Sequence, residues 1–247
     1  MSTVRPLAAG CVMAVLCTGA AEAQTRARRG FVTLNAAAQA AAAETDRHVF
    51  QVNAEAGSVE TRYPARTAVL IDGGIGFRFS RRVGAAVAIA RATASGRAAV
   101  SASVPHPLVD DQDRLVQGEA TDLRWTETAT HLQLFYELPS ATRWRVQLFA
   151  GPSYVRREQT LVCEVLVNET YPFDTATFQS ALTGPATGSG VGVNLGADVS
   201  WMFGRRTGAG LLVRYTRASL DLNAPDSRTV SSDGGGLQAG AGLRFTF

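Results

Sequence analysis

The sequence predicts an all-β fold, an eight-stranded antiparallel transmembrane up-and-down β-barrel. Three observations point to it. Apolar residues alternate with polar or small ones along several segments, short and long connections alternate between those segments, and aromatic residues gather at the segment ends nearest the short connections. Alternation with a period of two is typical of a strand with one apolar face. Short turns on one side and long polar loops on the other are typical of transmembrane barrels.

The alternation is clearest in residues 237–247, where apolar side chains take every second position and polar or small residues lie between them. The same period runs through residues 191–203. Reading all such segments predicts eight strands: Phe31–Gln39, Val69–Phe79, Val83–Ala94, Thr128–Leu138, Trp144–Tyr154, Val191–Phe203, Ala209–Ala218 and Leu237–Phe247.

The first strand has an alternative position. Residues 48–60 also alternate and could replace it or extend the first hairpin above the membrane. The alanine run 36–43 favours helix over strand by intrinsic propensity. The number of strands is the same in either case.

The connections between these strands differ in length. Tight turns are predicted at 80–82, 139–143 and 204–208, and long polar loops at 40–68, 95–127, 155–190 and 222–236. Barrels of this type carry their long loops on the extracellular side. We therefore expect the four long loops to face outward from the cell.

Aromatic residues support the same topology. Tyr154 and Tyr215 lie toward the long-loop ends of their strands, and a larger set lies near the short turns: Phe31, Phe77, Phe79, Tyr136, Trp144, Trp201, Phe203, Phe245 and Phe247. Barrels concentrate aromatic rings at the two lipid headgroup zones. A soluble β-sandwich would also alternate, but it gives no reason for aromatic residues at one end of nearly every strand.

The N-terminus has the layout of a secretory signal peptide. Arg5 precedes an apolar run over 7–16, and Ala21-Glu22-Ala23 supplies a small-x-small cleavage site before Gln24. The run is shorter than the roughly 20 residues of a spanning helix. We expect residues 1–23 to be removed and residues 24–247 to form one barrel domain. That part of the chain contains one cysteine, Cys163, so no internal disulfide is expected and a buried or loop thiol is the expectation.

The formal net charge is +3, which gives no support to nucleic-acid binding. All basic residues are arginine, a side chain that suits forked contacts to lipid phosphates, although genomic base composition explains the bias equally well.

Residues 31–247 resemble the OmpA/OmpX-type family of small bacterial outer-membrane barrel domains. The last residues, LQAGAGLRFTF, are similar to the C-terminal signal that such proteins present to the barrel-assembly machinery, which implies an assembly role for Leu243, Phe245 and Phe247. The resemblance implies a bacterial outer-membrane location, with outer-membrane lipid and lipopolysaccharide as partners. An extracellular ligand stays open, and a periplasmic peptidoglycan-binding domain is not expected.

Strand parity places charges of both signs inside the barrel: Asp72, Arg78, Glu137, Arg145, Asp198, Arg214 and Arg244. Eight strands leave an interior just wide enough for side chains, so these charges are expected to pair across it as a plug. The turn 204–208 predicts that Asp198 lies opposite Arg214. The turn 139–143 likewise predicts Glu137 opposite Arg145.

No catalytic, cofactor or metal site is expected. His48 and His106 fall in predicted loops, and His131 faces the lumen. Lipid A deacylases of similar size have a serine two residues after the histidine, where this chain has Gln133.

The acidic residues Asp110, Asp111 and Asp113 are too few for a calcium loop.

Taken together, these features predict a non-enzymatic barrel whose surface loops have a structural or interaction role. A narrow pore and an enzyme acting on outer-membrane lipid remain alternatives.

Overall fold

The computed structural model describes residues 29–52, 55–140, 143–225 and 228–247. The predicted signal peptide and its cleavage site lie outside these residues. Within them the chain forms ten strands: β1 (Gly30–Ala41), β2 (Glu44–Val52), β3 (Glu55–Tyr63), β4 (Arg66–Arg78), β5 (Val83–Pro105), β6 (Asp113–Glu137), β7 (Trp144–Glu169), β8 (Ala176–Trp201), β9 (Thr207–Asn223) and β10 (Thr229–Thr246).

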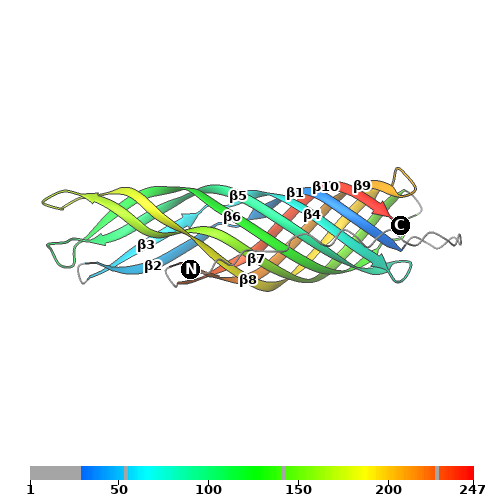
Figure 1. Cartoon of the computed structure of the whole chain (residues 1–247), viewed down its shortest axis with the longest axis horizontal. Helices are drawn as coiled ribbons and strands as arrows, with labels where there is room; N and C mark the ends of the chain where they lie inside the picture. Colours follow the sequence, from blue (N-terminus) through cyan, green and yellow to red (C-terminus); the bar gives the residue numbers. More distant parts are fainter. Residues whose placement is uncertain (1–28, 53–54, 141–142, 226–227) are drawn as a thin grey trace, which may run out of the picture.

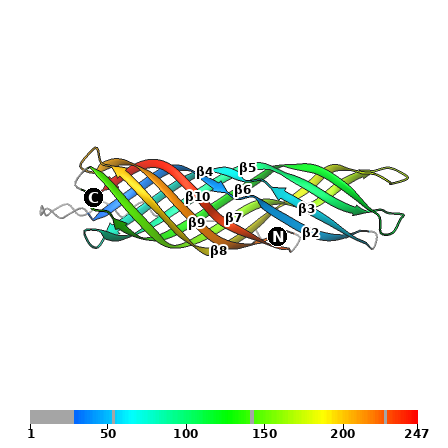
Figure 2. The same ribbon diagram turned by 180° about the vertical axis from the view of Figure 1, so that it is seen from behind.

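Eight of these strands close into an antiparallel ring. The order β5-β4-β1-β10-β9-β8-β7-β6 returns to β5 through the β5–β6 pairing. The first and last strands join at Phe31↔Thr246, and the amides of Gly30 and Phe247 bond to each other's carbonyls at 3.0 and 2.9 Å. Figure 1 shows the resulting long barrel with the C-terminus at the tight-turn end, and Figure 2 shows β10, β9 and β8 running obliquely across the other side. The predicted eight-stranded barrel is confirmed.

The first hairpin carries the two additional strands. β2 pairs with β3 from Glu44↔Tyr63 to Val52↔Glu55, and β3 continues the sheet against β5 from Ser58↔Ser103 to Arg62↔Ala99. The structure therefore keeps both positions considered for the first strand: residues 30–41 are in the ring, and the second alternating segment extends the hairpin beyond it. The alanine run forms strand, because its backbone pairs with β4 and β10 on both sides.

The outward face carries an apolar belt around the ring. Large apolar side chains that are about half exposed or more include Leu34, Val69, Ile71, Ile75, Ile89, Leu132, Leu134, Leu148, Val191, Val193, Leu195, Leu211 and Leu237. A continuous apolar surface of this extent is unfavourable in water and suits the hydrocarbon of a bilayer. In the described part of the chain, no helix is long and apolar enough to cross a membrane.

Aromatic residues border this belt at the tight-turn end, with one exception. Phe77, Trp144 and Phe203 are among the exposed rings there, whereas Phe31 is 8% exposed. Phe31 points into the lumen and makes an edge contact with Phe135, with ring centroids 5.3 Å apart. The prediction that Phe31 belongs to the outward aromatic residues was wrong. Phe31 lies at the start of its strand, so no preceding strand residues indicate which way its side chain points.

The long-loop side differs from the sequence prediction. β5 to β8 are 23 to 26 residues long, so the regions predicted as loops at 95–127 and 155–190 are mostly strand. Within the belt the apolar residues face out, but above it they face in: Val100, Ala102 and Val104 are buried, while the serines between them are partly exposed. The alternation with a period of two continues, but the apolar residues now face inward and the polar ones outward. A search for strands with apolar outward faces therefore misses this part, because its outward residues are polar.

This extension has its own apolar core, built from Val59, Tyr63, Ala98, Val100, Val116, Leu123, Leu161, Val162, Ala186 and Leu222 among others. Tyr63 is 2% exposed, and its hydroxyl oxygen accepts a hydrogen bond from the Val162 amide at 3.2 Å. The core makes the extension a packed structure in place of four separate loops.

Alkaline pH is expected to destabilise this extension through Tyr63. Burial raises the pKa of Tyr63 from 10.0 to about 12. A group whose pKa is raised on folding stabilises the fold fully below its unfolded pKa and loses that contribution as pH rises through the folded value. We expect the stability of the extension to fall between pH 10 and 12 and the Tyr63→Phe variant to lose less stability over that range. Urea unfolding followed by tryptophan fluorescence at several pH values measures this stability. An equal loss of stability with rising pH in both proteins would contradict the prediction.

Candidate functional site in the barrel interior

The predicted inward charges lie in the lumen at the level of the belt, where they form a chain of contacts. Arg214 donates to Asp72 at 2.7 Å, and Asn35 donates to the other Asp72 oxygen at 2.7 Å. Arg244 continues the chain, since it donates to Asn35 at 2.7 Å and forms an ion pair with Asp198. All five side chains are at least nine-tenths buried. The inward charges are thus compensated by partners on other strands.

The predicted pairing of Asp198 with Arg214 was wrong. Both face the lumen, but Asp198 lies opposite Leu212, and Arg214 lies opposite Gly196. The β8–β9 turn is centred one residue earlier than expected, because Trp201 is the residue paired with Ala209 and the Gly204 amide bonds to the Thr207 carbonyl. A shift of two residues keeps every side chain on its face and changes only its partner.

The second predicted pair is displaced in the same way. Glu137 lies opposite Gln147, not Arg145, and its ion-pair partner is Arg78 at 2.8 Å. The Gln147 amide also donates to Glu137 at 3.3 Å. Arg78 packs its guanidinium 5.3 Å from the centre of the Phe31 ring. Charged side chains and aromatic rings together fill the tight-turn end of the lumen.

His131 lies within hydrogen-bond distance of a serine that the sequence did not connect with it. Its Nδ1 is 2.8 Å from the Ser153 hydroxyl oxygen, and the Asn194 amide donates to the same oxygen at 2.8 Å. A histidine beside a serine is the core of a nucleophilic site. Here, however, His131 and Ser153 are 0% and 2% exposed and face the filled lumen, away from lipid and solvent. The arrangement serves as part of the polar filling.

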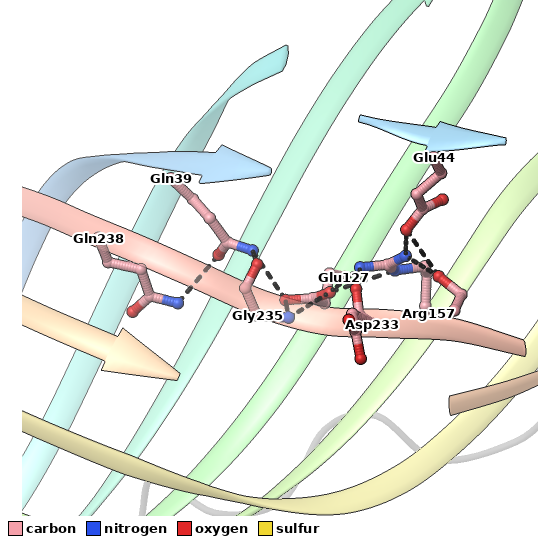
Figure 3. A network of polar contacts seen from close by, with 8 residues as sticks. Gln39, Glu44, Glu127, Arg157, Asp233, Gly235 and Gln238 are labelled. Carbon is pink, nitrogen blue, oxygen red and sulfur yellow. Dashed lines mark hydrogen bonds and ion pairs between the residues drawn. The ribbon is translucent and has the colours of Figure 1, made fainter. Parts of the chain in front are cut away.

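A second network closes the barrel at the upper edge of the belt (Figure 3). Glu127 and Arg157 lie opposite each other on β6 and β7, and two guanidinium nitrogens of Arg157 donate to Glu127 Oε2 at 3.0 and 3.2 Å. The Gln39 side chain and the Gly235 amide donate to Glu127 Oε1 at 2.8 and 3.1 Å. Gly235 has φ +93, a conformation that favours glycine and lets its amide reach the carboxylate.

Arg157 is bound on its other side as well. It donates to Glu44 of β2 at 2.6 Å and to the Asp233 carbonyl of β10 at 2.7 Å, and its guanidinium lies 5.3 Å from the Trp125 ring centre. Figure 3 shows how one arginine connects strands from both sides of the barrel. Side chains of β2, β6 and β7 thus meet main-chain groups of β10 inside the barrel.

Neither Glu127 nor Arg157 was identified in the sequence, because both fall at the ends of segments that were assigned to loops. The alternation along the chain nevertheless indicated that both side chains face inward. Glu127 keeps the period of His131 and Ala129, and Arg157 keeps that of Ser153 and Val155, so continuing the first strand by one residue and the second by three would have placed both inside.

Little space remains in the lumen between these layers. A cavity of about 30 Å³ lies beside Asn35, Asp72, Gln133, Phe149 and Arg214. This volume holds on the order of one or two water molecules. Above the second network lies the apolar core of the extension, beside a pocket of about 540 Å³ whose lining includes Phe50, Val104 and Cys163.

The remaining chemical candidates lie near the far end of the extension. Asp113 accepts a hydrogen bond from Ser103 at 2.6 Å, and the Asp111 amide donates to Glu55 at 3.2 Å, so these residues are engaged in local contacts. Cys163 is partly buried. In the residues that the structure describes, no cluster of three or more His, Cys, Asp or Glu side chains could hold a metal ion.

Comparisons with known proteins support the fold. No protein-family model matches the chain, and no curated protein matches its sequence. Among solved structures, the outer membrane protease OmpT of Escherichia coli is similar with a TM-score of 0.50 at 10% identity, over 89% of this chain and 97% of that one.

Two further solved barrels are similar at lower scores. The outer membrane protein OprG of Pseudomonas aeruginosa has a TM-score of 0.47 at 10% identity, over 89% of this chain and 96% of that one. Neisserial surface protein A has 0.44 at 14% identity, over 88% and 97%. The closed eight-stranded ring and the similarity to OmpT show that the chain has the fold of the outer-membrane β-barrel proteins, the architecture that its resemblance to the OmpA/OmpX type predicted.

Proposed function

We propose that this chain is a non-conducting barrel of the bacterial outer membrane that holds a rigid β-extension at the cell surface, where it has a structural or interaction role. The observation that carries the proposal is the filling of the lumen at the level of the belt and at the network above it. Two polar networks occupy the lumen at successive levels, and an apolar core lies above them.

The extension supports a surface role. Crossing a bilayer takes about 9–11 residues per strand, whereas β6, β7 and β8 have 25 or 26. Most of each strand therefore lies beyond the apolar belt, where its packed core keeps the hairpin ends in place. Such an arrangement presents a preformed surface, which costs less ordering entropy on binding than a flexible loop does.

The two alternative functions have less support. A pore needs a continuous path. Among the described residues, the lumen at the level of the belt holds a cavity of about 30 Å³ beside Arg214, and the pocket of about 540 Å³ in the extension is separated from it by the network of Glu127 and Arg157. A hydrolase needs a nucleophile that substrate can reach, and the serine next to His131 is buried among side chains. The protease activity of OmpT is therefore not proposed for this chain.

Conductance tests the proposal directly. The full-length protein reconstituted in planar bilayers is expected to give no stable open conductance, because ions would have to displace paired buried charges. An open porin prepared in the same way serves as the positive control. Reproducible channel openings that disappear on heat denaturation would overturn the proposal.

The orientation of the protein in the membrane is tested on intact cells. An epitope inserted between Asp110 and Asp111, at the β5–β6 end of the extension, is expected to bind antibody on intact cells. An epitope between Arg205 and Arg206 should bind only after permeabilisation. The opposite result would place the extension in the periplasm and remove the surface role.

A further inference from the structure

A shallow groove of about 270 Å³ lies on the outer face of the barrel where the apolar belt ends, across β5, β6 and β7. It is lined by two arginines, one glutamate, three threonines and a tyrosine: Arg91, Arg156, Glu158, Thr126, Thr128, Thr130 and Tyr154. These residues lie on the outward face, so the groove is separate from the lumen networks.

The strand register puts the two arginines in one row. Arg91 pairs with Thr128, and Thr128 pairs with Arg156. Neighbouring strands lie about 4.8 Å apart, so the two arginine backbones are about 10 Å apart with a hydroxyl between them. Both guanidinium groups can therefore reach a single small anion above Thr128.

The charge of the groove is net positive. Arg156 lies 3.5 Å from Glu158, and both side chains are largely exposed, a loose pairing that leaves most guanidinium donors available. Among the described residues, Arg91 has no acidic partner. On β8 to β10 the same row continues with Ser189, Asp221 and Ser231, so this part of the row carries no arginine.

The residues directly below the arginines belong to the apolar belt. The row Ile89, Thr130 and Tyr154 follows on the turn side, and Ile89, Leu132 and Val191 are more than half exposed. A ligand that uses both surfaces has an anionic head at the arginine row and hydrocarbon chains along the belt. Arginine binds phosphate through paired hydrogen bonds, and threonine hydroxyls add donors.

We propose that this groove binds the phosphorylated headgroup of an outer-leaflet glycolipid of the lipid A type, with its phosphate between Arg91 and Arg156 and its acyl chains on the belt below. This inference rests on the proposed outer-membrane location and orientation. It gives the barrel a fixed lipid neighbour on the β5–β7 side and leaves the interior unchanged.

The test compares binding of fluorescently labelled lipid A to the full-length protein and its variants in zwitterionic detergent micelles. The double variant Arg91→Gln/Arg156→Gln is expected to bind at least about tenfold more weakly, since charge-assisted hydrogen bonds are lost. The matched control Arg217→Gln, an exposed arginine on β9 that lies 3.9 Å from Asp233, should bind as the wild type does. All variants change only exposed side chains, and unchanged heat-modifiable gel mobility confirms their folding.

Two further ligands identify what the groove recognises. Dephosphorylated lipid A should bind the wild type about as weakly as lipid A binds the double variant, and inorganic phosphate should not displace lipid A because it lacks chains for the belt. Undiminished binding of the double variant or of dephosphorylated lipid A would overturn the proposal. Full displacement by inorganic phosphate would also overturn it and indicate a simple anion site. Channel activity would contradict the proposed sealed barrel without affecting this result.

Discussion

Replacing Arg157 with methionine is expected to destabilise the barrel by about 3–5 kcal/mol, because the buried carboxylate of Glu127 then lacks its counter-charge. Glu127 is 2% exposed and would keep only the Gln39 and Gly235 donors. The cost should appear in the free energy of unfolding measured by urea titration in bilayers. Arg124→Met, a change to an exposed arginine on the same strand as Glu127, is the matched control and should have little effect.

Replacing the partner residue Glu127 with glutamine is expected to lower the free energy of unfolding by less. In Glu127→Gln, Arg157 still has the carboxylate of Glu44 and the Asp233 carbonyl as acceptors. The double variant Arg157→Met/Glu127→Gln should recover part of the stability lost in the single Arg157 variant, because no unpaired carboxylate remains at position 127. Strictly additive effects would show that the two residues do not interact as Figure 3 indicates.

Asp72→Ala is expected to cause the second large loss, of about 3 kcal/mol. Its removal leaves Arg214, 1% exposed, without its only hydrogen-bonded carboxylate among the described residues. Adding Arg214→Leu should restore part of the loss, because the neutral side chain suits the neighbouring Phe149 ring.

Double-mutant cycles in the lumen would also test the register. The coupling free energy should be larger for Asp72 with Arg214 and for Asp198 with Arg244 than for Asp198 with Arg214. Stability is measured by the same unfolding assay. A dominant coupling between Asp198 and Arg214 would support the register predicted from turn length and contradict the structure.

The extension and the polar network across the lumen share contacts. Glu44 of β2 contacts Arg157 from the side of the first hairpin, and Asp46 of the same strand pairs with Arg228 at 3.1 Å. The hairpin that was predicted as a loop therefore supplies part of the network that closes the barrel. Stability of the extension and closure of the lumen are expected to change together in variants of these residues.

The sequence by itself determined the eight segments that cross the apolar belt and, apart from Phe31, their faces. In a β-strand each side chain alternates with the next, and a lipid-facing surface requires apolar residues at every second position, so the segments around 69–79, 191–203 and 237–247 could be recognised one at a time. The inward position of Asp72, Asp198 and Arg244 follows from the same local rule. These statements depend only on neighbours in the chain.

The tertiary structure alone decided which charges meet. A register shift of two residues leaves the faces unchanged, so alternation cannot distinguish Arg214 opposite Asp198 from Arg214 beside Asp72. The extension was missed for a related reason: above the belt the solvent is water, so the outward residues become polar and the inward ones apolar. Only the packing of Tyr63, Val100 and Leu161 in one core reveals that this reversed pattern still forms strands.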